Sequence, residues 1–81
     1  MEQHERAGYR GFVIRPAPAP LRDGRWNHDL YVGRDKGSEF VERKFTFASS
    51  SATREEAISH GMTAGQKIIN GEVPNCSVAD L

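Results

Sequence analysis

The sequence predicts an α+β fold in which a three-stranded antiparallel sheet is packed by one C-terminal helix, in the order β-β-β-α. Three observations support this. Segments up to Phe47 alternate apolar and polar residues, turn residues separate them, and one apolar-periodic run begins after Thr53. A helix with one apolar face buries that face against a sheet. The 81 residues suffice for one domain, which we place at 9–81 after a flexible polar N-terminus at 1–8.

The strands are predicted from segments rich in aromatic and β-branched residues. They cover residues 9–15, 25–34 and 39–47. The alternating prolines of residues 16–20 end the first strand, because proline has no backbone donor for a sheet. Asp23 and Gly24 indicate a turn, and residues 35–38 indicate a hairpin loop, so the three strands are expected to form a meander.

The helix is predicted at residues 54–69 by a capping box at its start and a glycine after its end. Thr53 followed by Glu56 lets the threonine hydroxyl accept from the Glu56 N–H, while the Glu56 carboxylate accepts from the Thr53 N–H. Apolar residues then recur at helical spacing, and Gly71 stops the helix.

The expected core lies between the apolar face of the helix and one face of the sheet. It comprises Phe12, Ile14, Trp26, Leu30, Val32, Val41, Phe45, Phe47, Ala57, Ile58, Met62, Ile68 and Ile69. Gly61 and Gly65 lie inside the helix, where each costs about 1 kcal/mol relative to alanine. We therefore expect the helix to approach the sheet closely at these two positions.

Composition argues against several classes of protein. The net charge is zero; residues 9–47 carry +3 and residues 48–81 carry −2, which is far from the basic footprint of a dedicated nucleic-acid binder. Cys76 is the single cysteine, so no intramolecular disulfide forms and a reducing compartment is expected. No apolar run approaches the roughly 20 residues of a membrane span, and no signal-peptide pattern opens the chain. We expect a cytoplasmic protein.

No catalytic, cofactor-binding or metal-binding residue is predicted. The three histidines and Cys76 match no zinc-ligand spacing, and His28 is expected to be a half-buried strand residue with a satisfied hydrogen bond. Nucleophilic catalysis needs a serine or cysteine beside a base, and Cys76 has no basic group adjacent to it. The serines before the helix could suggest anion binding, but Glu55 and Glu56 already occupy the positive helix end. We therefore expect a protein without enzymatic activity.

The sheet face that points away from the helix is the expected functional surface. Its candidate partner-binding residues are Tyr9, Arg15, Tyr31, Phe40 and Lys44. Aromatic and basic residues together suit burial in a homodimer or against a protein partner, and they also suit stacking on nucleic-acid bases. A third reading is structural: residues 73–81 fold across this face and cover it. The first reading is our preferred hypothesis, and nucleic-acid binding is the alternative.

Several segments resemble a group of small uncharacterised bacterial proteins, a domain-of-unknown-function family with a β-β-β-α layout. The resembling segments are residues 9–12, 23–26, 52–57 and 65–81, together with Ile14 and Phe47. The resemblance implies the same fold and a bacterial cytosolic setting, and it brings no activity, cofactor or catalytic residue with it.

A weaker resemblance is to AP2-like DNA-binding domains, which also place three strands before a helix. It rests on Tyr9-Arg10-Gly11, Arg25-Trp26 and residues 53–57. The strands of such domains are densely basic, whereas Asp29, Glu39 and Glu42 lie in the predicted strands here.

Overall fold

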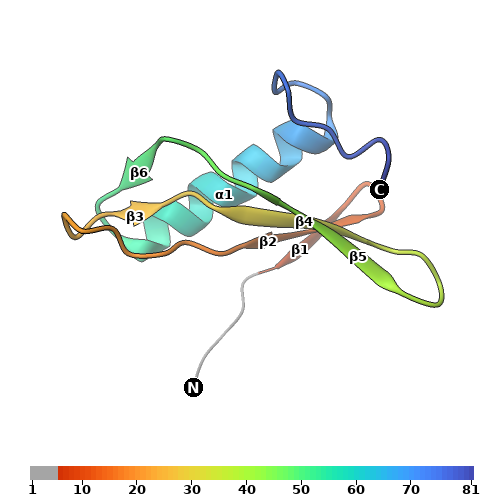
Figure 1. Cartoon of the computed structure of the whole chain (residues 1–81), viewed down its shortest axis with the longest axis horizontal. Coiled ribbons are helices and arrows are strands. Elements are labelled where there is room, and N and C mark those ends of the chain that lie inside the picture. The colour runs from red at the N-terminus through yellow and green to blue at the C-terminus, as the bar shows by residue number, and fades with distance from the viewer. Residues whose placement is uncertain (1–5) are drawn as a thin grey trace.

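The computed structural model describes residues 6–81, with one helix packed on an antiparallel sheet and a small second sheet beside it (Figure 1). The elements are β1 (Ala7–Tyr9), β2 (Phe12–Pro16), β3 (Trp26–Asn27), β4 (Leu30–Asp35), β5 (Phe40–Phe45), β6 (Ser50–Ser51) and α1 (Arg54–Ile69). The main sheet has the order β1-β2-β4-β5, and β3 pairs with β6. The α+β class and the C-terminal helix are confirmed, but the prediction of three strands is wrong because the main sheet has four.

A two-residue turn divides the first predicted strand into β1 and β2. Arg10 and Gly11 both have positive φ values, 52° and 86°, as the type I′ hairpin turn requires. The chain therefore reverses, and Tyr9 pairs with Phe12.

The same hairpin corrects the predicted N-terminal boundary. Ala7 and Gly8 were expected in the flexible segment 1–8, but they form β1 with Tyr9, because pairing with β2 satisfies their backbone. Residues 1–5 lie outside the described part of the chain.

The second predicted strand is interrupted between β3 and β4. Side-chain hydrogen bonds compete with regular pairing there: the Asn27 Oδ1 atom accepts from the N–H of Ala19 at 2.9 Å and from the N–H of Asp29 at 3.2 Å. β3 then pairs with β6, so Trp26 lies opposite Ser51 rather than in the main sheet. This departure places Trp26 outside the buried cluster that it was expected to join.

The helix has the predicted bounds, and its two ends are capped by backbone and side-chain groups. The Thr53 Oγ1 atom accepts from the Glu56 N–H at 3.1 Å, whereas no bond returns from the Thr53 N–H to the Glu56 carboxylate, so half of the capping box forms. At the other end, Gly71 has a φ of 77°. The Gly71 N–H donates to the Ile68 carbonyl, and the Glu72 N–H donates to the Lys67 carbonyl. These two bonds make a Schellman motif.

Removing the Thr53 hydroxyl is expected to destabilise the protein modestly. Thr53→Ala leaves the Glu56 N–H without its acceptor and should lower the free energy of unfolding by about 1 kcal/mol. Glu56→Ala is the matched control, with a smaller expected effect because the Glu56 side chain makes no bond to the cap. Urea denaturation measures both, and an unchanged midpoint for Thr53→Ala would contradict the cap.

The core joins α1 to the inner face of the sheet. The buried apolar residues are Ile14, Leu30, Val32, Phe45, Ala57, Ile68 and Val78. The predicted close approach of the two helix glycines is confirmed: a Cβ on Gly61 would lie 3.2 Å from the Cβ of Pro16, and one on Gly65 would lie 2.6 Å from the Cγ2 of Ile14. Glycine at these positions lets the helix sit directly on β2.

Candidate functional site

Strand register divides the main sheet into an inner face under α1 and an outer face. Ile14 pairs with Val32, and both are fully buried under the helix. Neighbouring positions along each strand point to the opposite side. We call this opposite surface the outer face; it comprises Val13, Arg15, Tyr31, Gly33, Phe40, Glu42 and Lys44. Four of the five candidate residues predicted from the sequence lie on it.

Tyr9 is the exception, and its predicted placement on the outer face is wrong. Its hydroxyl donates to the Asn70 Oδ1 atom at 3.1 Å, just beyond the end of α1, and its side chain packs against the core. The cause is the turn at Arg10 and Gly11. In a continuous strand Tyr9 would share a face with Val13, but across the hairpin it shares the face of Phe12.

Arg15 and Tyr31 form the centre of the outer face. The Arg15 guanidinium lies 4.2 Å from the centroid of the Tyr31 ring. Its Nε and Nη2 atoms donate to the Glu42 carboxylate at 3.1 and 3.0 Å, a bidentate pair. The hydrogen bonds to Glu42 raise the pKa of Arg15 above its ordinary value. The arginine is therefore held over the tyrosine ring, and its charge is paired with that of Glu42.

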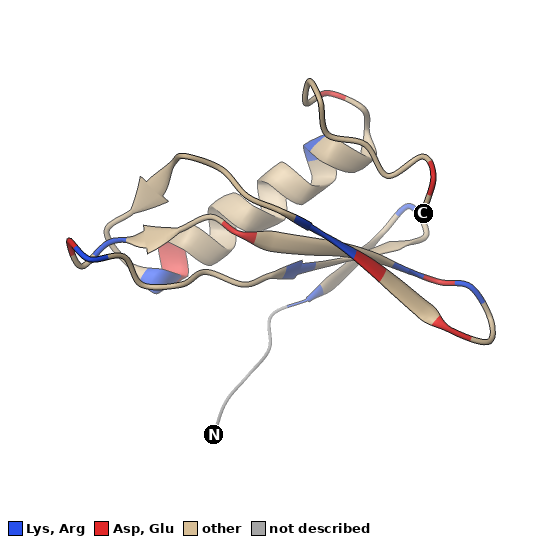
Figure 2. Ribbon diagram, in the orientation of Figure 1, with Lys and Arg blue, Asp and Glu red and all other residues tan. Residues whose placement is uncertain are grey.

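Lys44 borders the same ring from the β5 side. Its Nζ atom lies 6.0 Å from the Tyr31 centroid and 3.7 Å from Asp29 Oδ2. Each cation of the outer face thus has a carboxylate partner. Figure 2 shows basic and acidic residues interspersed along β4, β5 and their loop, without a region of one sign.

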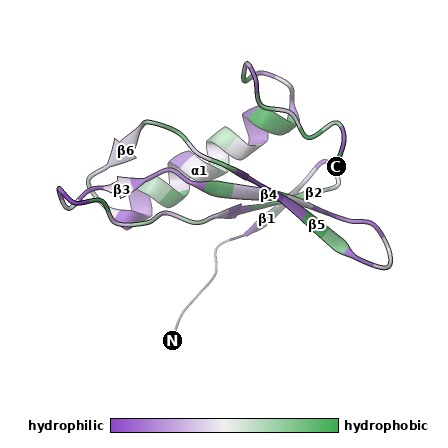
Figure 3. Cartoon of the chain, in the orientation of Figure 1, coloured by the Kyte–Doolittle hydropathy of each residue, from purple (hydrophilic) through white to green (hydrophobic). Residues whose placement is uncertain are grey.

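Phe40 supplies the exposed apolar part of the outer face. The Phe40 ring packs over Gly33 of the neighbouring strand β4. A Cβ on Gly33 would collide with the ring, so the ring contacts the glycine backbone directly. Even so, 49% of Phe40 is exposed to solvent. Figure 3 shows the apolar start of β5, away from the helix.

The C-terminal segment packs on the inner face, so the prediction that it could cover the outer face is wrong. Val78 is 4% exposed and joins the core cluster. Arg43, which pairs with the inner residue Val32, donates to the Asp80 carboxylate at 2.7 and 2.9 Å and to the Ser77 carbonyl at 2.9 Å. The C-terminal segment therefore packs on the inner face beside α1, and burial of Val78 stabilises this position of the segment.

A second cluster of polar residues lies between α1 and the β3–β6 sheet. The prediction of a half-buried strand position for His28 is wrong, because His28 lies between β3 and β4 and is buried. The predicted hydrogen bond is present, since its Nε2 atom lies 2.7 Å from Ser51 Oγ. Its ring stacks on that of His60, with the centroids 4.7 Å apart. Burial lowers the pKa of His28, and the nearby charges of His60 and Arg25 lower it further. No local pattern in the sequence indicates this pairing, because His28 precedes β4 and His60 lies on α1, far along the chain.

Comparisons with known proteins found no match to this chain among protein families, curated proteins or solved structures. The resemblances to the small bacterial family and to AP2-like domains therefore stay predictions. Within residues 6–81, no helix has both the length and the apolar character needed to cross a bilayer.

Proposed function

We propose that this chain is a non-enzymatic protein-interaction module whose outer face binds a second copy of the chain. The observation that carries the proposal is the half-exposed Phe40 ring beside the Arg15–Tyr31 stack, on a face that the C-terminal segment leaves open. Aromatic residues and arginine are enriched at the energetic centres of protein interfaces.

Charge complementarity supports a second copy as the partner. The outer face pairs two cations with two carboxylates, and the whole chain has zero net charge. Two such faces can therefore meet about a two-fold axis without net repulsion.

The same ion pairs weaken the case for nucleic-acid binding. Phosphate contacts need unpaired cations, yet Arg15 is bound to Glu42 and Lys44 lies beside Asp29. Base stacking needs an open aromatic face, and the Arg15 guanidinium already covers one face of Tyr31.

The polar cluster under α1 also favours a non-enzymatic role. Ser51 is hydrogen-bonded to His28, as a nucleophile would be to its base. However, Ser51 is 5% exposed and does not line the neighbouring pocket, so its hydroxyl is not presented to a substrate.

Self-association is tested by sedimentation equilibrium from micromolar to millimolar concentrations. We expect a monomer–dimer equilibrium that Phe40→Ala weakens by about tenfold or more, equivalent to about 1.4 kcal/mol. Leu21→Ala is the matched control, because Leu21 is also a large exposed side chain, at 40%, but lies in the loop before β3. The control should dimerise like the parent chain.

Two results would contradict this proposal. One is a monomer at every concentration. The other is tight binding to DNA or RNA at physiological salt that is lost when Arg15→Ala and Lys44→Ala are combined, since this outcome would support the alternative function.

A further inference from the structure

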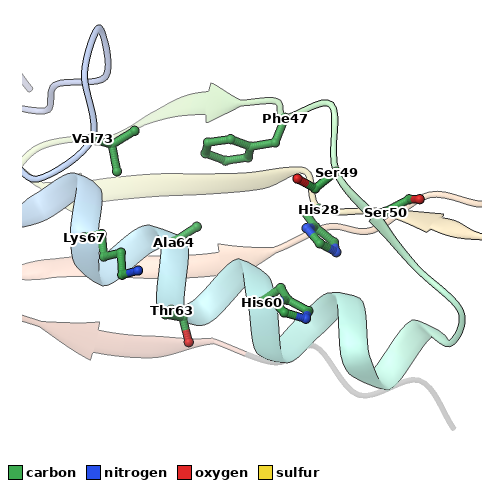
Figure 4. Close-up of a pocket in the computed structure, with 9 residues that line it drawn as sticks. All are labelled: His28, Phe47, Ser49, Ser50, His60, Thr63, Ala64, Lys67 and Val73. Atoms are coloured by element: carbon green, nitrogen blue, oxygen red, sulfur yellow. The ribbon is translucent and has the colours of Figure 1, made fainter.

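A pocket of about 430 Å³ lies between α1 and the chain segment that precedes it, on the helix side of the molecule (Figure 4). Its volume is within the range of about 300–1,000 Å³ typical of small-molecule sites. The helix contributes successive residues of one face, including His60, Thr63 and Lys67, and the facing wall includes Phe47 and Ser49. The outer face plays no part in it.

The polar lining of the pocket is cationic or hydrogen-bond donating, and no carboxylate lines it. Lys67 is exposed, and no described carboxylate lies within ion-pair distance of its Nζ atom. Because side chains on a helix lean toward its N-terminus, the Lys67 side chain extends toward Thr63, as Figure 4 shows. Serine and threonine hydroxyls add further donors.

A second cation, Arg25, is hydrogen-bonded to Ser50 of the pocket wall. The Arg25 Nε atom donates to Ser50 Oγ at 2.7 Å, and its Nη2 atom donates to the Ser50 carbonyl at 2.8 Å. Burial is the main cause of the depressed pKa of His28, and Arg25 contributes to it. The pocket thus has one cation in its lining, Lys67, and a second, Arg25, bonded to its wall, although the whole chain is neutral.

The remaining lining is apolar. Phe47, Ala64 and Val73 form this part of the wall, and Val73 lies toward the end of the pocket away from the two imidazoles (Figure 4). A ligand that combines an anionic group with a small apolar body fits both parts of the lining.

We infer that the pocket binds a small organic anion, whose charged group contacts Lys67 and whose apolar part packs against Phe47 and Val73 at the same end of the pocket. Lys67 would supply the charge that holds the anion, and Arg25, hydrogen-bonded to Ser50 of the pocket wall, adds to the attraction.

The probe is 4-methylbenzenesulfonate, which stays anionic near neutral pH. It is titrated into the ¹⁵N-labelled chain, and binding is measured from the chemical shifts of the backbone amides. We expect saturable shifts at Ser49, Thr63 and Ala64. Lys67→Gln should weaken binding about tenfold or more, and Lys67→Arg should retain it.

Lys36→Gln is the matched control, because it removes an exposed lysine in the loop between β4 and β5 and should leave the sulfonate affinity unchanged. Dispersed amide spectra show that each variant is folded. Three results would overturn the inference: no saturable shift, an affinity that Lys67→Gln leaves unchanged, or equal binding of 4-methylbenzylammonium. Inorganic sulfate that binds as tightly as the sulfonate would overturn the apolar half of the inference.

Discussion

Replacing Ile14 with alanine is expected to lower the free energy of unfolding by about 2–5 kcal/mol. Ile14 is fully buried at the centre of β2, where it meets the helix at Gly65 and pairs with Val32. The loss combines the removed apolar contacts with the cavity that remains. Urea denaturation measures the change, and Ile14→Val, with an expected cost of about 0.5–1.5 kcal/mol, gives a milder variant for comparison.

A double-mutant cycle with Gly65 makes this prediction specific to the helix–sheet contact. A Cβ on Gly65 would lie 2.6 Å from Cγ2 and 3.0 Å from Cγ1 of Ile14. Gly65→Ala should therefore destabilise the parent chain by about 1–3 kcal/mol. With Ile14→Ala those atoms are gone, and the same substitution should stabilise the helix by up to about 1 kcal/mol.

Gly61→Ala is the control for this cycle, because its added Cβ meets Pro16 rather than Ile14. It should have the same effect in both backgrounds. If Gly65→Ala were equally destabilising with and without the Ile14 side chain, the close approach described here would be wrong.

Replacing Val78 with aspartate is expected to detach the C-terminal segment and cost about 1.5–3 kcal/mol, the value of one buried valine. Val78 is buried among Leu30, Phe45 and other core residues. The ion pair between Arg43 and Asp80 should not hold the segment alone, because both side chains are substantially exposed and such pairs contribute little.

The readouts are the denaturation midpoint and the rate at which the Cys76 thiol reacts with a disulfide reagent. Cys76 packs partly against the core, so detachment should speed its reaction. Ala79→Asp adds the same charge at the neighbouring exposed position and should leave both readouts near their parent values. Equal effects of the two substitutions would show that Val78 does not anchor the segment.

Local signals in the sequence were enough to determine the helix and much of the outer face. The helix bounds follow from the Thr53 cap and from Gly71, since capping involves groups only a few residues apart. The alternation within each strand also placed Arg15, Tyr31, Phe40 and Lys44 on one side correctly, because the side-chain period of a strand is two whatever its partner is.

The tertiary structure decided which segments pair. A single turn at Arg10 and Gly11 reversed the side of Tyr9, since a change of direction alters which residues share a face. The β3–β6 pairing, the docking of Val78 and the stacking of His28 on His60 join residues far apart in the chain. Such contacts depend on the space that the packed elements leave, which periodicity and capping do not encode.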